Sequence, residues 1–183
     1  MMKAINLFLN NALFIAMFCS LFLISKSTYA ENITKVRSAF IFKISKFMTF
    51  PPPTLNNMKL CFFNEKKGPE KFLFSKKSLK SQTPPISIVF FDDIEKIMEL
   101  NHSCNIIYLN ENIQSKIDKQ WINKISSKVV VIGETLEFLD LGGLVALIQK
   151  GNKVRIFINK AKLSQSQVKI ESRLLALVKF HPQ

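Results

Sequence analysis

The chain has 183 residues, a formal net charge of +13 and 48% hydrophobic residues. This length suits one ordinary domain with its own hydrophobic core. The charge favours an acidic protein or an anionic surface as partner. Nucleic acid is disfavoured, because the positive charge comes mostly from scattered lysines and no basic cluster is interleaved with aromatic residues.

The first 30 residues have the pattern of a secretory signal peptide. Lys3 gives a short positive region, a long apolar run follows, and Thr28 and Ala30 take the small-residue positions of a cleavage site. We expect cleavage after Ala30 and export, with an uncleaved anchor helix as the alternative. Two of the 26 basic residues and none of the 13 acidic ones lie in this segment, so the mature chain, 31–183, carries +11.

The segment that follows predicts an amphipathic helix over residues 32–50. Apolar side chains recur at the spacing of one helix face, at Val36, Phe40, Ile44 and Phe47. Three prolines from Pro51 onward end the helix. We expect its apolar face to pack on a sheet, and a helix lying on a membrane surface is the alternative.

Short apolar strands then alternate with helical stretches. The predicted strands are 59–63, 86–91, 104–109 and 129–132, and the predicted helices are 69–74, 92–100 and 111–126. Nearly continuous apolar strands that alternate with helices indicate a parallel sheet covered on both faces. The sequence therefore predicts a single α/β domain whose mixed, mostly parallel sheet is flanked by helices, as in flavodoxin-like or Rossmann-like folds.

The last third of the chain predicts a β-hairpin. Its strands are 144–149 and 154–158, joined by Lys150-Gly151-Asn152, where two residues tolerate positive φ. Gly142-Gly143 precedes the first strand, as a bend or a close backbone approach requires. The hairpin should add an antiparallel edge to the sheet. Asn159 should cap a helical turn, and a terminal helix is expected over 171–179.

The mature chain has no recognisable catalytic set. Its two histidines, His102 and His181, lack metal-ligand spacing, and no nucleophile elbow, P-loop or dinucleotide-binding glycine motif occurs. Gly133-Glu134 follows the fourth strand, where α/β ligands often bind. We nevertheless interpret Glu134 and Asp92-Asp93 as helix caps or solvated charges. The prediction is a non-enzymatic protein without a cofactor.

Cysteine and arginine are scarce enough to be informative. Cys61 lies in the first strand and Cys104 begins the third; these strands are neighbours in a flavodoxin-like order, so we expect a disulfide in an oxidising compartment. Two buried free thiols are the alternative. Among the few arginines, Arg155 and Arg173 should use their planar donor forks to pair with carboxylates inside the domain. A contact with a partner is the alternative for both.

Both ends of the mature chain resemble the YfiR/HmsC-like family. At the N-terminal end the similar residues are Arg37, Ala39, Phe40, Ile41, Phe42, Lys43, Lys46, Phe47, Phe50 and Pro51. At the C-terminal end they are Gly142, Gly143, Val154, Arg155, Ile158, Asn159, Ala161, Ile170, Ser172, Arg173, Leu174 and Leu175. Cys61 and Cys104 are similar in position to the family's cysteine pair. The chain departs from the family pattern at residues 166–169.

The resemblance implies a periplasmic repressor that binds the periplasmic sensory domain of an inner-membrane diguanylate cyclase. Bound in this way, it would keep cyclic di-GMP and biofilm formation low. An OmpA-like outer-membrane lipoprotein is implied as a second partner, and a homodimer is left open. Arg155, Arg173 and Asn159 are the structural or partner-contacting candidates. The alternative function is a periplasmic small-ligand sensor that uses the loops after Phe63 or Ile132.

Overall fold

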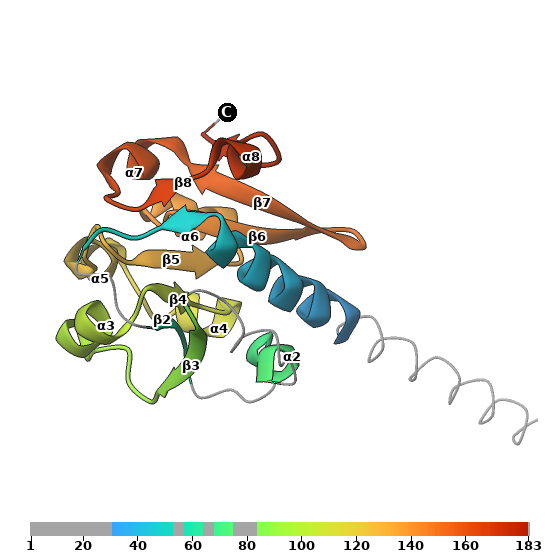
Figure 1. Cartoon of the computed structure of the whole chain (residues 1–183). Coiled ribbons are helices and arrows are strands. Elements are labelled where there is room, and N and C mark those ends of the chain that lie inside the picture. Colours follow the sequence, from blue (N-terminus) through green and yellow to red (C-terminus); the bar gives the residue numbers. More distant parts are fainter. Residues whose placement is uncertain (1–30, 53–56, 64–67, 75–83, 183) are drawn as a thin grey trace, which may run out of the picture.

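A seven-stranded sheet forms the centre of the computed structural model, which describes residues 31–52, 57–63, 68–74 and 84–182 (Figure 1). In spatial order the strands are β3 (Ile86–Phe91), β2 (Met58–Phe63), β4 (Ile106–Tyr108), β5 (Val130–Gly133), β6 (Val145–Lys150), β7 (Lys153–Asn159) and β9 (Lys179–His181). All neighbours run parallel except β6 and β7, which form the antiparallel hairpin. The predicted mixed, mostly parallel sheet is therefore confirmed.

Helices cover both faces of this sheet. Residues 31–46 are helical and lie on one face (Figure 1). The other helices are α2 (Glu70–Phe74), α3 (Ile97–Ser103), α4 (Glu111–Gln114), α5 (Lys119–Lys124), α6 (Leu136–Asp140), α7 (Lys160–Gln165) and α8 (Ser172–Leu175). A small antiparallel sheet joins β1 (Met48–Thr49) to β8 (Lys169–Ile170). Within the described residues, no helix is both long and apolar enough to cross a membrane.

The side chains of the strands contribute to two separate hydrophobic cores, because successive side chains of a strand point to opposite faces of the sheet. In β2, Leu60 and Phe62 join the core that contains the apolar residues of the N-terminal helix. Cys61 and Phe63 join the second core, to which α3, α5 and α6 contribute. This arrangement places the N-terminal helix and the cysteine pair on opposite faces of the sheet.

The N-terminal helix is shorter than predicted, and its packed face matches the predicted one only in part. Ile44 is fully buried and Phe40 packs against the same core, as predicted, but Val36 does not belong to this face. The helix ends at residue 46, and its buried apolar residues include Ile33, Ile41 and Ile44, whereas Val36 is 37% exposed. The buried side also contains Ser38 and Ser45. Because two serines lie on the packed face, the spacing of apolar residues alone does not mark this face completely.

Acidic side chains that cap internal turns change two of the predicted helices. One begins later than predicted, and the other is divided in two. Asp93 accepts a hydrogen bond from the Glu95 backbone N–H at 2.8 Å, and the helix predicted from residue 92 begins only at Ile97. The predicted helix 111–126 is two helices. Asp118 caps the second by accepting from the Trp121 N–H at 2.8 Å.

The end of the chain also differs from the prediction. The expected helix over 171–179 is the single turn α8, and residues 179–181 form β9 beside β7. The edge of the sheet is therefore β9 rather than the hairpin. Helix α6, which was not predicted, begins after Thr135, whose hydroxyl accepts from the Phe138 N–H at 3.2 Å.

The double glycine confirms the expected bend and close approach. Gly142 has a φ of +106°, which favours glycine. A Cβ on Gly143 would lie 2.1 Å from Cε1 of Phe138, which is fully buried. Gly142 therefore allows the bend, and Gly143 leaves the space that the Phe138 ring fills.

Candidate functional site

A buried polar network lies where β4 and β5 end. Tyr108 is the last residue of β4, and Glu134 directly follows β5. Arg37 comes from the N-terminal helix, and its Nη1 lies 3.1 Å from Glu134 Oε1, with the two side chains 16% and 8% exposed. The Tyr108 hydroxyl donates to the same carboxylate oxygen. The network therefore joins the helix to two strands of the sheet.

Further hydrogen bonds hold the ion pair in place. Arg37 Nε donates to the Leu147 carbonyl oxygen in β6 at 3.4 Å. The second carboxylate oxygen of Glu134 accepts from the Glu111 backbone N–H at 3.3 Å. Because both oxygens of the carboxylate have donors, this buried charge is paired and hydrogen-bonded, as burial of an ion requires.

Gln114 of α4 closes the network from the other side. Its Nε2 donates to the Leu109 carbonyl oxygen at 3.1 Å. Its Oε1 accepts from the Glu134 backbone N–H and from the Thr135 hydroxyl, each at 3.2 Å. The side chain is buried. Gln114 thereby fixes the backbone at the position where Glu134 leaves the sheet.

The environment shifts the pKa values of both acidic groups upward. Burial raises the pKa of the Glu134 carboxyl, and the neighbouring Arg37 charge opposes part of that rise. Burial, followed by the negative charge of Glu134, raises the pKa of Tyr108 well above its usual value. Tyr108 thus stays a hydrogen-bond donor at neutral pH.

Among the described residues, the network leaves no room for a substrate. The cavity beside it, bordered by Phe62, Glu70 and Tyr108, has a volume of about 10 Å³, which is about the space needed for one water molecule. In the described part of the chain, no three His, Cys, Asp or Glu side chains are placed to hold a metal ion. The geometry is that of a structural clamp, and it does not favour a ligand site at the loop after Ile132. The other predicted loop, 64–67 after Phe63, lies outside the described residues.

Interpreting Glu134 as a cap or solvated charge was wrong, since its carboxylate is buried and ion-paired. Its partner Arg37 lies in a helix far earlier in the chain. The scarcity of arginine was the one signal in the sequence that could have indicated a buried ion pair at Arg37. The planar fork expected of an arginine is used at Arg37, which makes two separate contacts.

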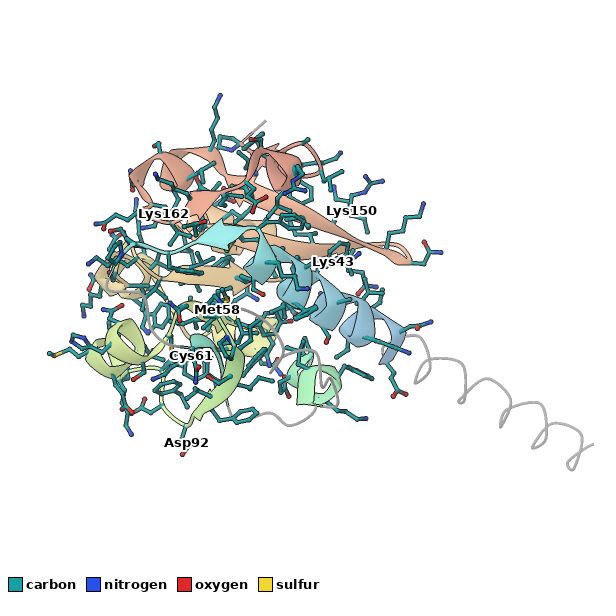
Figure 2. The ribbon with its side chains drawn as sticks, in the orientation of Figure 1. Lys43, Met58, Cys61, Asp92, Lys150 and Lys162 are labelled. Carbon is teal, nitrogen blue, oxygen red and sulfur yellow. A yellow bond between two sulfur atoms is a disulfide. The ribbon has the colours of Figure 1, made fainter. Side chains whose placement is uncertain are left out.

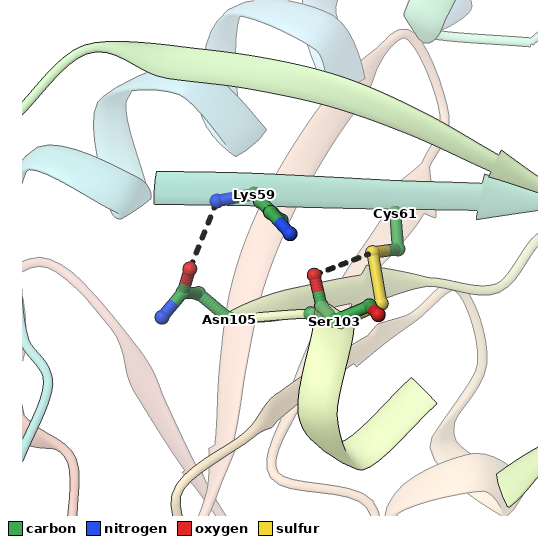
Figure 3. Close-up of a disulfide and its surroundings, with 5 residues drawn as sticks. Lys59, Cys61, Ser103 and Asn105 are labelled. Atoms are coloured by element: carbon green, nitrogen blue, oxygen red, sulfur yellow. Dashed lines mark hydrogen bonds between the residues drawn. A yellow bond between two sulfur atoms is a disulfide. The ribbon is translucent and has the colours of Figure 1, made fainter. Parts of the chain in front are cut away.

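A disulfide joins Cys61 of β2 to Cys104, which precedes β4, with the Cα atoms 5.9 Å apart (Figure 3). The two strands are neighbours, as the predicted strand order requires. Cys61 is fully buried and Cys104 is 4% exposed. Next to the bridge, Asn105 Oδ1 accepts from the Lys59 backbone N–H at 2.9 Å. A covalent bond and a hydrogen bond thus fix β2 to the segment that leads into β4.

The three C-terminal candidates have different environments. Asn159 Oδ1 accepts from the Lys162 N–H at 2.9 Å, and its Nδ2 donates to the Leu139 carbonyl oxygen at 2.8 Å. It caps α7, as expected. Arg173 pairs with Glu171 at 3.1 Å but is 82% exposed. Arg155 is exposed on β7, and no ion pair holds it within the described residues.

Charge is distributed unevenly between the two edges of the sheet. From residue 141 onward the sequence has eight lysines and arginines and one acidic side chain, Glu171. These residues belong to the elements from β6 to β9, which we call the basic edge. Acidic residues gather around β3 and α3 at the opposite edge, at Asp92, Asp93, Glu95 and Glu99. Figure 2 shows Asp92 at the other end of the molecule from Lys150 and Lys162.

The model of the YfiR/HmsC-like family matches residues 34–179. The chain belongs to this family. YfiR/HmsC-like proteins are regulatory rather than catalytic, are periplasmic, and generally associate with the periplasmic domain of a diguanylate cyclase. Comparison with curated proteins gives no match.

Two solved structures share the fold of this YfiR/HmsC-like protein. A conserved domain protein from Vibrio cholerae O1 biovar El Tor has a TM-score of 0.55 and 12% identity over 78% of this chain and 59% of that chain. The ABC domain in complex with L-Trp from Streptococcus pneumonia has a TM-score of 0.51 and 8% identity over 67% and 54%. The chain thus spans less than two thirds of either structure, and the similarity shows the fold alone.

Proposed function

We propose that this protein is a periplasmic negative regulator that binds the periplasmic domain of an inner-membrane diguanylate cyclase and keeps cyclic di-GMP production and biofilm formation low. The observation that carries the proposal is the family match over residues 34–179. The polar network is consistent with it, because its buried groups satisfy one another and, in the part of the chain that the structure describes, leave no space for a substrate. Control would therefore act through protein binding.

Export is part of the proposal, since the cyclase domain to be bound lies outside the cytoplasm. The predicted signal peptide over residues 1–30 supplies it. Mature protein recovered from the periplasm should begin at Glu31, which intact-mass measurement can check. A mass that includes residues 1–30 would instead favour the uncleaved anchor helix.

We place the contact surface on the basic edge. Arg155 and Arg173 are exposed there, and Arg173 is only weakly engaged by a surface ion pair. Leu177 is 78% and Phe180 37% exposed on the same part of the chain. Exposed apolar side chains surrounded by cations fit a partner surface that is apolar at its centre and acidic at its rim. The exposure of the two arginines favours a partner contact over a structural role.

The deciding experiment measures cyclic di-GMP in cells. Deleting the gene should raise cyclic di-GMP and surface attachment, and both effects should require the cyclase and disappear on re-expression of an exported copy. A copy without residues 1–30 should fail to restore repression. Unchanged cyclic di-GMP after deletion, with the cyclase demonstrably expressed, would contradict the repressor function and favour the small-ligand sensor.

The contact surface is tested with purified proteins. The double substitution Arg155→Glu and Arg173→Glu should weaken binding to the cyclase domain by about tenfold, because it replaces two rim cations by anions. Lys116→Glu, at an exposed residue outside the basic edge, is the charge-reversal control and should bind normally. Equal affinities for the two variants would refute this surface. An OmpA-like lipoprotein as second partner and a homodimer stay predictions.

A further inference from the structure

A cavity of about 200 Å³ lies next to the disulfide, at the amino ends of β4 and β5. Asn105, which precedes β4, and Val129, which precedes β5, line it together with Phe50 from the segment after β1. It lies at the opposite end of these strands from Tyr108 and Glu134. Its volume is several times that of one water molecule, so a small organic molecule fits.

The side chains that line the cavity are apolar, basic or neutral, and none is acidic. Phe50, Pro51 and Val129 make an apolar wall, and no aspartate or glutamate borders the cavity. Lys128 and His102 are exposed at it. The amide oxygen of Asn105 accepts from the Lys59 N–H, so the part of this amide left to meet a ligand is a donor. The polar groups therefore suit a hydrogen-bond acceptor with negative charge.

We propose that this cavity binds a small organic anion with an apolar body, and that the bound anion shields the Cys61–Cys104 disulfide from reduction. The apolar body would lie against Phe50 and Pro51, and the anionic group would meet Lys128. Apolar walls with a few polar groups that fix orientation are usual in small-molecule sites. The site does not rest on the proposed function.

The shielding follows from the position of the two cysteines. Both cysteines belong to the second core, but only Cys104, which is 4% exposed, lines the cavity, and Cys61 is fully buried. A small thiol entering here would reach Cys104 first. Its thiolate would attack the Cys104 sulfur and release Cys61 as a thiolate; a second thiol would then free Cys104. The balance is one protein disulfide and two small thiols giving two protein thiols and one small disulfide.

Three probes of similar size, each with one phenyl ring, test the charge preference: benzoate, neutral benzamide and cationic benzylamine. Each is titrated into the mature protein purified from the periplasm, and backbone amide shifts are followed by NMR. We expect benzoate to shift the amides of Asn105, Lys128 and Val129 and to bind more tightly than the other two. Binding of benzamide or benzylamine at least as tight as that of benzoate, or benzoate shifts confined to other residues, would overturn the proposal.

Substitution of the lysine supplies the matched test. Lys128→Met should weaken benzoate binding by about two- to fivefold, the size of one exposed ion pair. Lys153→Met, at an equally exposed lysine in the distant hairpin, should leave it unchanged. Both changes are on the surface, so folding should be preserved. Equal benzoate affinities for the two variants would rule out the role of Lys128 and with it the anion site.

The shielding has its own measurement. Saturating benzoate should slow reduction of the disulfide by dithiothreitol severalfold, and the same concentration of benzylamine should not. An unchanged rate with benzoate bound would refute the shielding. Neither measurement involves the cyclase, so a failure here is distinct from a failure of the repressor function.

Discussion

Replacing both Cys61 and Cys104 by alanine should lower the free energy of unfolding by about 4 kcal/mol. The bridge closes a loop with a sequence separation of 43. In the chain-entropy model, removing a cross-link of that span returns about 4 kcal/mol of conformational entropy to the unfolded chain at 25 °C. Alanine is chosen because both sites are buried and a serine hydroxyl there would add a cost of its own.

This loss should be visible as a large shift in melting temperature. For a domain of this size, 1 kcal/mol corresponds to about 2–4 °C, so the double variant should melt about 8–16 °C below the oxidised wild type. Thermal unfolding followed by circular dichroism is the assay. Wild-type protein treated with a reductant is the control and should melt close to the variant, because both lack the bridge.

Two results would refute this reasoning. One is a double variant that melts within about 2 °C of the oxidised wild type, which would mean that the unfolded chain is not constrained by the bridge. The other is a thiol titration that finds two reactive cysteines in untreated protein. The same titration should instead find no thiol until the protein has been denatured and reduced.

Three further predictions concern the clamp and the glycine bend. Arg37→Ala should lower the free energy of unfolding by about 3 kcal/mol in chemical denaturation, because it leaves the buried Glu134 carboxylate unpaired; Lys43→Ala, exposed on the same helix, should change it by less than about 0.5 kcal/mol. Because burial raises the pKa of Glu134 above its ordinary 4.5, the folded state holds this proton more tightly than the unfolded state. The stability of wild type relative to Glu134→Gln should therefore rise as the pH falls from neutral through the raised pKa, and a difference that shrinks on acidification would contradict the assigned direction. Gly143→Ala should destabilise the domain by about 2 kcal/mol or more, since its Cβ would overlap the buried Phe138 ring; melting near the wild-type temperature would show that the ring can move aside.

Local sequence patterns determined where the main strands lie and how they alternate with helices along the chain. Apolar runs such as 86–91 and 129–132 are strands within one or two residues of the prediction. Gly151 adopts the positive φ expected in the hairpin turn, and Asn159 caps α7. These features succeed because the period of a strand, the conformational freedom of glycine and the reach of a capping side chain act over a few neighbouring residues.

Tertiary structure decided the features that depend on distant groups. Arg37 donates to a carbonyl oxygen 110 residues away, and nothing in its neighbourhood specifies that oxygen or the Glu134 carboxylate. Residues 179–181 became a strand because β7 offered an edge, although the local pattern suggested only a helix that ends at residue 179. The packed face of the N-terminal helix was likewise set by what lies beneath it. The energies of ion pairing and strand pairing, and the burial of a side chain, depend on which groups the fold brings together. A local sequence pattern does not specify those groups.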